Sequence, residues 1–247
     1  MIKGAFSIME KFATETGIME DYNCSSGILK SEVNALIVLK HKSIKMYSAL
    51  KRTLDILLAL VILICASPVM AIIAIAIKME SEGPVIFKQK RSGKNGVEFM
   101  LYKFRSMAVN NDVYDFKCVD RHTRVGKIIR KLSLDELPQL FNILKGDMSF
   151  IGPRPWIPEY YENMNGMQRR RYDVLPGLTG LAQAKGRNDI SIFEKINYDL
   201  EYVRNYSLIE DVKIVFLTVG TVLSEKGADA GKQTIQNELE ELKEQGV

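Results

Sequence analysis

Residues 56–77 read ILLALVILICASPVMAIIAIAI and contain no charged side chain. At about 1.5 Å of rise per residue, a helix over this stretch is about 33 Å long, enough to cross the hydrocarbon of a bilayer. The alternative is a helix buried inside a soluble core. We favour a membrane helix because all faces of the segment are apolar.

The middle of this segment carries a helix-bending element, Ser67-Pro68, because proline removes a backbone donor. Basic residues flank both ends, which favours keeping both ends in the cytoplasm. A helix that enters the membrane, bends at Pro68 and returns on the same side satisfies both observations; a straight span is the alternative. Asp55 is expected to pair with Arg52 at the interface. The flanking basic residues are Lys42, Lys45, Lys51 and Arg52 before the segment and Lys78, Lys88, Lys90 and Arg91 after it.

We divide the chain into an accessory N-terminal extension (1–45), the membrane helix (46–80), a catalytic domain (81–224) and a polar C-terminal tail (225–247). The tail is low in aromatic residues, so it is expected to be a surface helix or disordered.

The domain after the membrane helix is expected to be α+β and mainly helical. Gly83-Pro84 should break the membrane helix. Short apolar runs on either side of a glycine-containing turn predict a small β-hairpin, and apolar residues at helical spacing predict helices. The expected strands are 85–87 and 99–102 around a turn at 92–96, and the expected helices are 126–144, 158–172, 190–206 and 208–224.

Composition restricts the chemistry. Only two histidines are present, His41 and His122, so catalysis must depend on carboxylates and basic residues. The three cysteines lack metal-ligand spacing, which argues against a zinc site or a disulfide framework. The net charge of +4 is mild and suits anionic lipid or phosphorylated substrates, and we expect no nucleic-acid partner.

Two adjacent carboxylates, Asp135 and Glu136, are the main catalytic candidates. Ser133 and Glu136 have capping-box spacing, while Pro138 favours a slightly later helix start. Either start places both carboxylates where the helix dipole favours anions, so their pKa values are expected to be lowered. Plain helix capping is the alternative role for the pair.

Basic residues surround this pair in the sequence and are candidate phosphate contacts. Arg154 lies between two prolines, so its backbone is fixed, which suits a preorganised bidentate contact. For each basic residue the alternative is a solvated surface charge. The candidates are Lys103, Arg105, Arg130, Lys131, Arg154 and the loop Lys185-Gly186-Arg187-Asn188.

Six sequence motifs, in their order along the chain, closely resemble those of a family of bacterial sugar transferases, the monotopic phosphoglycosyl transferases, in its small form. The match runs from about Lys51 to Leu223, and six motifs in the family's order make coincidence very improbable. The motifs are KRTLD (51–55), Ser67-Pro68, YKFRSM (102–107), LDELPQ (134–139), GDMSFIGPRP (146–155) and PGLTGLAQ (176–183).

The resemblance implies a reentrant helix kinked at Ser67-Pro68 and amphipathic helices in the membrane interface. It also implies a ping-pong reaction. Asp135 resembles the nucleophile that attacks a UDP-sugar and expels UMP, and Glu136 resembles a ligand of Mg²⁺. Polyprenyl phosphate then takes the phosphosugar. The implied nucleotide or phosphate contacts are Lys103, Arg130, Arg154 and Arg187.

The implied location is the cytoplasmic face of the bacterial inner membrane, with membrane lipid as a partner. The sugar, the glycan pathway and the oligomeric state stay open. Two rivals also stay open: a non-catalytic membrane assembly factor that retains the fold, and an enzyme acting on phospholipid head groups.

Overall fold

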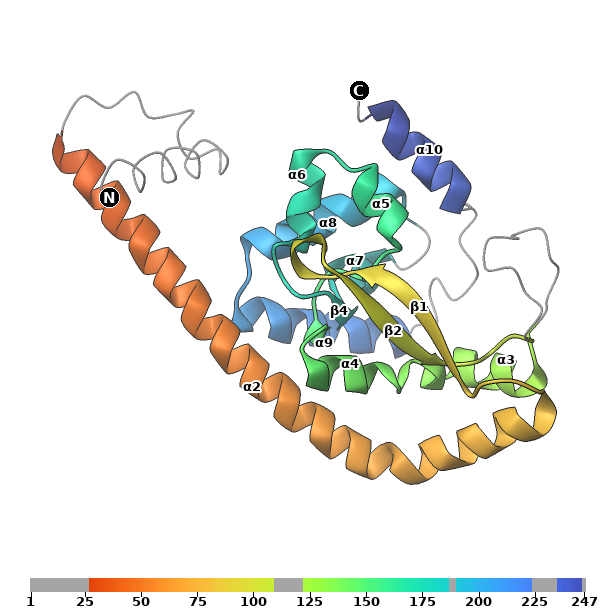
Figure 1. Cartoon of the computed structure of the whole chain (residues 1–247). Coiled ribbons are helices and arrows are strands. Elements are labelled where there is room, and N and C mark those ends of the chain that lie inside the picture. The colour runs from red at the N-terminus through yellow and green to blue at the C-terminus, as the bar shows by residue number, and fades with distance from the viewer. Residues whose placement is uncertain (1–26, 109–121, 187–189, 224–234, 246–247) are drawn as a thin grey trace. The chain divides into compact units, whose positions relative to one another are not determined.

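The computed structural model describes residues 27–108, 122–186, 190–223 and 235–245 (Figure 1). The chain divides into two compact units, Met1–Met46 and Tyr47–Val247, and every candidate site residue lies in the second. Most described residues are helical, with two small sheets. In chain order the elements are α2 (Gly27–Glu80), β1 (Ile86–Ser92), η1 (Lys94–Gly96), β2 (Glu98–Phe104), α3 (Arg124–Lys131), η2 (Leu134–Glu136), α4 (Gln139–Lys145), β3 (Ser149–Ile151), α5 (Pro158–Glu162), α6 (Gly166–Arg169), η3 (Arg170–Tyr172), β4 (Gly177–Thr179), α7 (Leu181–Gly186), α8 (Ile192–Arg204), α9 (Leu208–Leu223) and α10 (Ile235–Gln245).

Helix α2 contains the apolar segment, and Figure 1 shows it bent rather than straight. Pro68 lies inside the helix and cannot donate to the carbonyl of Ile64. The hydroxyl of Ser67 donates to that carbonyl instead, at 2.8 Å. Ser67 thus satisfies the acceptor that Pro68 leaves without its backbone donor, which is a requirement for a bent helix in lipid.

The apolar side chains of α2 mostly face outward. Within the described residues, Ser43–Glu80 is the one helix long and apolar enough to cross a membrane, and only 11% of its most apolar window is buried. This excludes the alternative of a helix buried in a soluble core. Large apolar side chains that a soluble protein would hide, such as Ile64 at 72% and Ile72 at 67% exposure, indicate a membrane protein.

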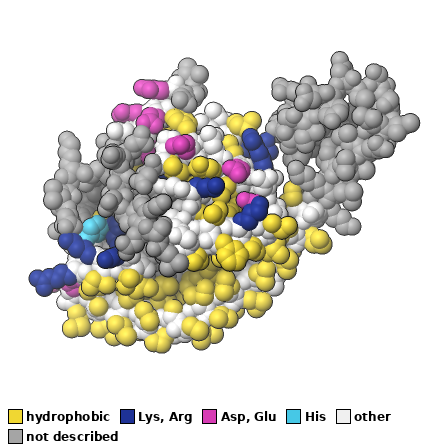
Figure 2. Space-filling view, turned by 180° about the vertical axis from the view of Figure 1, so that it is seen from behind, with side chains coloured by type: hydrophobic (Ala, Val, Ile, Leu, Met, Phe, Trp, Pro, Cys, Tyr) yellow, Lys and Arg dark blue, Asp and Glu magenta, His cyan; other side chains and the backbone are white. Residues whose placement is uncertain are grey.

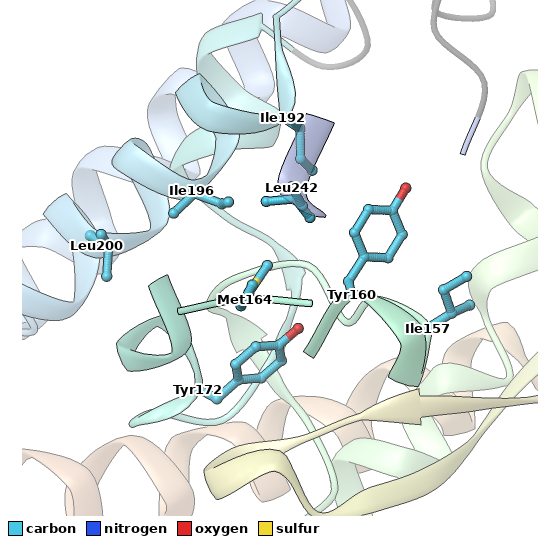
Figure 3. Close-up of a cluster of buried hydrophobic side chains, with 8 residues drawn as sticks. All are labelled: Ile157, Tyr160, Met164, Tyr172, Ile192, Ile196, Leu200 and Leu242. Atoms are coloured by element: carbon cyan, nitrogen blue, oxygen red, sulfur yellow. The ribbon is translucent and has the colours of Figure 1, made fainter. Parts of the chain in front are cut away.

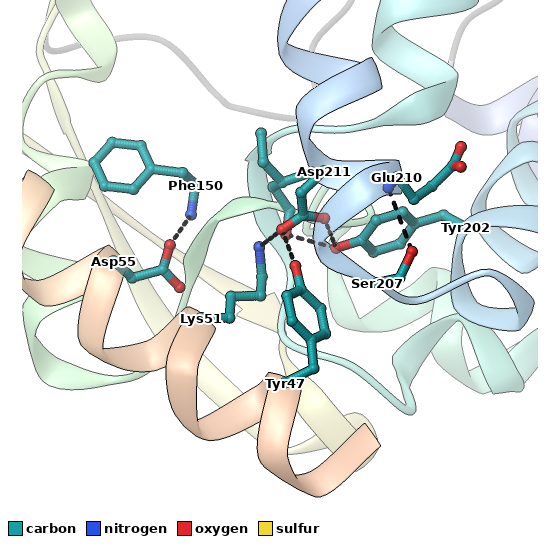
Figure 4. Close-up of polar contacts among 9 residues, drawn as sticks. Tyr47, Lys51, Asp55, Phe150, Tyr202, Ser207, Glu210 and Asp211 are labelled. Carbon is teal, nitrogen blue, oxygen red and sulfur yellow. Dashed lines mark hydrogen bonds and ion pairs between the residues drawn. The ribbon is translucent and has the colours of Figure 1, made fainter. Parts of the chain in front are cut away.

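The N-terminal arm of α2 is held to the catalytic domain by polar contacts (Figure 4). Lys51 forms a buried ion pair with Asp211 of α9. Arg52 donates to the carbonyls of Ile143 and Leu144 at the end of α4, at 2.5 and 2.8 Å.

Asp55 accepts a 3.2 Å hydrogen bond from the backbone N–H of Phe150. The expected pair between Asp55 and Arg52 is therefore wrong. Both side chains satisfy backbone groups of the catalytic domain instead of each other.

The C-terminal arm of α2 packs on the same domain through apolar contacts. Ile73 and Ile77 are buried against Phe104 of β2 and Ile129 of α3. The helix ends at Glu80, and Gly83 follows with a φ of 110°, so the predicted break at Gly83-Pro84 is confirmed.

Arg105 closes the turn that follows α2. Its guanidinium donates to the carbonyls of Ser81 and Glu82, at 2.8 and 2.6 Å. This basic residue, a sequence candidate for phosphate contact, therefore has a structural role.

The predicted hairpin is confirmed, with β1 and β2 antiparallel. The outer edge of β2 is bound by Asn142 of α4, which is fully buried. The Asn142 amide donates to the carbonyl of Met100 at 2.7 Å, and its oxygen accepts from the N–H of Tyr102 at 3.1 Å. One side chain thus replaces a neighbouring strand and fixes α4 against the strand that carries Lys103.

Two predicted helices are broken in the structure. The expected helix 126–144 is interrupted after α3, because Ser133 adopts a left-handed conformation with a φ of 56°. The expected helix 158–172 consists of α5, α6 and η3 in succession. The helices expected at 190–206 and 208–224 are confirmed as α8 and α9. Helix α7 was not predicted, and its end overlaps the loop that was expected from Lys185.

A second sheet, which the sequence analysis did not predict, pairs β3 and β4 in parallel. It brings the loop after Ile151 beside the turn at Pro176. A Cβ on Gly177 would lie 2.1 Å from the backbone nitrogen of Gly152, so only glycine permits this approach. The close pairing fixes the backbone from which Arg154 projects.

The largest core cluster lies between α5, α8 and α10 (Figure 3). Leu242 of α10 is fully buried in it beside Ile192 and Ile196. Glu238 of α10 accepts hydrogen bonds from Tyr160 and, at 2.7 Å, from Lys195. The expectation of a surface helix is confirmed for 235–245, where most side chains are at least partly exposed, and Leu242 and Glu238 are the two buried side chains that attach this helix to the core.

Exposed apolar side chains gather in a band along one edge of the molecule, with charged groups above it (Figure 2). Helix α9 contributes to the exposed apolar surface with Ile209 at 71% and Phe216 at 73% exposure. Ile128 within α3 and Leu132 just after that helix are each 60% exposed. Such a surface suits lipid contact.

The anchoring of α10 predicts that Leu242→Ala lowers the free energy of unfolding by about 2–5 kcal/mol, since it leaves a cavity in a packed core. Thermal unfolding of the full chain in detergent measures the loss. The exposed Glu244 on the same helix is the matched control, and Glu244→Ala should change stability by less than about 0.5 kcal/mol. Equal stability of the two variants would show that α10 is not part of the cooperative core.

Candidate active site

The two candidate carboxylates project from η2, a single turn held by its flanking leucines. Leu134 packs with the cluster around Phe104, and Leu137 packs with that cluster and with the one around Leu140. The turn follows the left-handed Ser133, whose side chain forms no capping hydrogen bond. The predicted capping box is therefore wrong, and the helix proper starts later, at Gln139 after Pro138.

Glu136 brings together three separate parts of the chain. Its Oε1 accepts a 2.7 Å hydrogen bond from Nζ of Lys103 on β2. The same oxygen accepts from Nη2 of Arg154 at 3.2 Å. Three of the predicted site residues, distant in sequence, are thus in direct contact.

The two cations control the ionisation of Glu136. Burial acts to raise the pKa of this carboxyl, but Arg154 and Lys103 outweigh burial and lower the pKa to about 2. Glu136 therefore remains ionised at neutral pH. Burial in turn lowers the pKa of Lys103, and Glu136 opposes that effect.

Asp135 has the opposite electrostatic setting. Its pKa is raised, chiefly because the carboxyl is buried, while Lys103 and Arg130 oppose the rise. The expectation of a lowered pKa holds for Glu136 and is wrong for Asp135. Asp135 sits in a three-residue turn before the main helix, and there desolvation outweighs the lowering of its pKa by Lys103, by Arg130 and by a backbone hydrogen bond.

The two other predicted phosphate contacts are Arg130 and Arg187. Arg130, near the end of α3, is exposed and acts on Asp135 through its charge. Its Nη1 lies 3.3 Å from Nε2 of His122. Arg187 lies outside the described residues.

Two residues that support the site were missed by the sequence analysis. Asn142 interrupts an otherwise apolar helix face, and that interruption is a signal for a buried polar role. Arg171 is buried and donates a 2.8 Å hydrogen bond to the carbonyl of Arg154. Within a run of three arginines, no local pattern separates Arg171 from its surface neighbours.

A magnesium ion fits the chemistry of this site when a phosphorylated substrate supplies further oxygens. Mg²⁺ is commonly held by one or two carboxylates together with substrate phosphates. Asp135 and Glu136 supply two carboxylates. The part of the chain that the structure describes holds no group of three or more acidic, histidine or cysteine ligands, so the protein alone offers no complete cage there.

Comparison with known proteins gives a consistent result. A family model described as bacterial sugar transferase matches residues 46–225. The uncharacterised sugar transferase EpsL of Bacillus subtilis (strain 168) is 44% identical over 180 residues, covering 72% of this chain and 89% of that protein. The UDP-N-acetylgalactosamine-undecaprenyl-phosphate N-acetylgalactosaminephosphotransferase of Aeromonas hydrophila is 44% identical over 194 residues.

That second match covers 74% of this chain and 45% of the Aeromonas protein. The UDP-glucose:undecaprenyl-phosphate glucose-1-phosphate transferase of Caulobacter vibrioides is 41% identical over 190 residues, covering 72% of this chain and 71% of that protein. The chain thus spans most of EpsL but less than half of the longer Aeromonas relative.

The pKa of Asp135 is raised and that of Glu136 is lowered, so replacing each carboxylate by a neutral amide should have opposite effects on stability. Asp135→Asn should raise the unfolding temperature near pH 7.5, because ionising a buried Asp with a raised pKa disfavours the folded state. The advantage should disappear below about pH 4, where the unfolded chain's carboxyls are also protonated.

Glu136→Gln should instead destabilise the chain by about 1–3 kcal/mol, since it leaves the two partly buried cations Lys103 and Arg154 without their shared negative charge. Thermal unfolding across this pH range compares the two variants. A lower unfolding temperature for Asp135→Asn at pH 7.5 would contradict the electrostatic description.

Proposed function

The chain belongs to the bacterial sugar transferase family, and from this premise we propose that it transfers a sugar 1-phosphate from a UDP-sugar to polyprenyl phosphate, releasing UMP. The names of the Aeromonas and Caulobacter relatives, which specify undecaprenyl phosphate, support this acceptor. Those relatives act on different sugars, so identity to them does not select the sugar. The reaction would begin the assembly of an exopolysaccharide, a capsule, an O-antigen or a glycoprotein glycan.

The observation that carries this proposal is the division of labour between adjacent carboxylates. Glu136 is bound by two cations, whereas within the described residues Asp135 has no ion pair. A buried carboxylate that is poorly solvated is a stronger nucleophile when ionised. Asp135 is therefore the better nucleophile, and Glu136 the better anchor for cations.

In the proposed reaction an Asp135 oxygen attacks the β-phosphorus of the UDP-sugar. The bond from that phosphorus to the bridging oxygen breaks, and UMP leaves with the electron pair. An oxygen of the polyprenyl phosphate then attacks the same phosphorus and releases the Asp135 carboxylate. Two displacements let the nucleotide and the lipid use the site in turn.

The surrounding cations suit the charge that such a reaction develops, since phosphoryl transfer depends mainly on positioning and charge neutralisation. Lys103 and Arg154 lie together at Glu136, and Arg130 acts on Asp135. We assign these three side chains and Arg187 to the phosphates or nucleotide. Mg²⁺, held by Glu136 together with the diphosphate, would neutralise charge on the leaving nucleotide.

The contacts of α2 support a reentrant arrangement of this helix. Lys51 in the N-terminal arm and Ile77 in the C-terminal arm both contact the domain that contains Asp135. A straight helix that crossed the bilayer would separate these two ends by about 30 Å of hydrocarbon. We therefore propose that both ends of the apolar segment and the active site lie at the cytoplasmic face of the inner membrane.

An enzyme is favoured over a non-catalytic assembly factor because a scaffold has no physical need for this arrangement. Burying Asp135 and clustering Lys103 and Arg154 around one carboxylate are costly unless a substrate uses them. An apolar filling of the same volume would serve a scaffold at least as well.

The nucleophile assignment predicts that Asp135→Asn folds but releases UMP at least about 10³-fold more slowly than the parent protein. The assay supplies undecaprenyl phosphate, Mg²⁺ and a panel of UDP-sugars. Asp173→Asn alters an exposed carboxylate and is the control, with unchanged turnover expected. Substantial turnover by Asp135→Asn would remove this residue from the reaction.

In the same assay, Glu136→Ala should require a higher Mg²⁺ concentration for half-maximal rate. A magnesium dependence equal to that of the parent would mean that another group holds the metal.

The reentrant arrangement predicts the accessibility of single cysteines placed at His41 and Lys94. Both should react with a membrane-impermeant maleimide only from the cytoplasmic side, because both ends of the bent helix return there. Inverted and right-side-out vesicles distinguish the sides. Labelling of the two positions from opposite sides would demonstrate a spanning helix.

A further inference from the structure

Arg171 of η3 is a buried cation beside the candidate active site. It is 1% exposed, although its neighbours Arg169 and Arg170 lie nearer the surface. Isolated charges are seldom buried in this way, because removal from water is costly unless partners compensate. The contacts of its guanidinium therefore indicate what the burial achieves.

Asp199 of α8 is the charge partner of Arg171. Nε and Nη2 of the guanidinium donate to Oδ2 of Asp199 at 2.9 and 2.7 Å. Asp199 is itself 2% exposed. This pair orients the plane of the guanidinium and anchors it to a long helix of the core.

Besides a contact with the ring of the adjacent Tyr172, two contacts of Arg171 reach the loop that carries Arg154. Nη2 donates to the backbone carbonyl of Arg154 at 2.8 Å. The guanidinium carbon lies 3.8 Å from the ring centroid of Trp156, a stacked cation–π contact. The loop is thus held at two points, on either side of Pro155.

The stacking on Trp156 together with the hydrogen bonds to Asp199 and to the Arg154 carbonyl requires a flat guanidinium. It can stack on an aromatic ring with its face while its edge donates to a carboxylate and a carbonyl. A lysine ammonium has no such face and edge. The arrangement is therefore specific for arginine rather than for positive charge.

We propose that Arg171, oriented by Asp199 and stacked on Trp156, is a positioning residue that sets the Arg154 side chain at the phosphate-binding site. This inference rests on the proposed function, in which Arg154 contacts the diphosphate. Arg154 itself is 46% exposed and forms a 3.2 Å contact with Glu136, so its own contacts restrain it weakly. Fixing its backbone lowers the cost of placing the guanidinium correctly for reaction.

The test uses the full chain in detergent with undecaprenyl phosphate and the UDP-sugar that gives the most UMP. Arg171→Lys and Asp199→Asn should each lower kcat about ten- to hundredfold, since small misplacements at a reacting centre have effects of this size. Trp156→Leu, which removes the stack from the loop side, should lower kcat similarly. Arg170→Lys, a change in the neighbouring part-exposed arginine, should leave turnover unchanged.

A double-mutant comparison separates positioning from general destabilisation. If Arg171 acts through Arg154, then Arg171→Lys should lower kcat less than about threefold in an Arg154→Ala background. A merely structural role would give the same loss in both backgrounds. Equal losses would overturn the inference, and so would full activity of Trp156→Leu.

Trp156 also provides a readout that needs no turnover, because it is the chain's single tryptophan. Arg171→Lys should increase acrylamide quenching of its fluorescence, whereas Arg170→Lys should not. Unchanged quenching in Arg171→Lys would contradict the proposal even if activity fell. If the parent protein released no UMP from any UDP-sugar, the proposed function would fail, and quenching would still decide whether Arg171 holds the loop.

Discussion

The candidate site depends on the contacts that the Glu136 carboxylate makes with two cations. One oxygen accepts from Lys103 of β2 and from Arg154 of the loop after β3, so it joins segments that are far apart in the sequence. Without a shared anion, the two cations would repel each other in a partly buried site. Glu136 takes up this positive charge, while its neighbour Asp135 is buried without an ion pair among the described residues, and burial together with the Glu136 charge raises the pKa of Asp135. A substrate diphosphate would enter a site whose cations are already gathered.

The second constraint is the anchoring of α2 at both ends. Polar contacts fix its first arm to α4, α9 and β3, and apolar contacts fix its second arm to β2 and α3. The hydroxyl of Ser67 donates to the carbonyl that Pro68 cannot reach, so the bend leaves no unsatisfied acceptor there. The outward apolar side chains of α2 and α9 then indicate which surface meets lipid. In the proposed reaction, this arrangement would place the active site close to the lipid carrier.

Much of the fold could be predicted from the sequence because the patterns that indicate it lie within short segments. The uncharged run 56–77 and the hairpin around its turn followed from composition and local patterns. The grouping of Lys103, Glu136 and Arg154 in one site was implied by the resemblance to the sugar transferase family. The predictions were wrong where contacts between distant segments determine the backbone conformation, the pKa or the partner of a side chain. The left-handed Ser133 breaks a periodic helix, burial reverses the pKa shift expected for Asp135, and Arg52 and Asp55 bind backbone groups of distant segments. Arg171 has neighbours of identical type, so only the folded chain distinguishes the buried arginine from the exposed ones.

In the proposed mechanism, Asp135 carries the phosphosugar covalently between the two displacements. The direct measurement uses a UDP-sugar labelled at the β-phosphate, mixed with the full chain and Mg²⁺ without lipid acceptor, followed by rapid quenching and intact-mass analysis. The expected result is a labelled protein heavier by one phosphosugar, mapped by fragmentation to Asp135, and loss of the label when polyprenyl phosphate is added. An active protein that transfers the phosphosugar to lipid without ever carrying the label, or that carries it on another residue, would rule out Asp135 as the nucleophile.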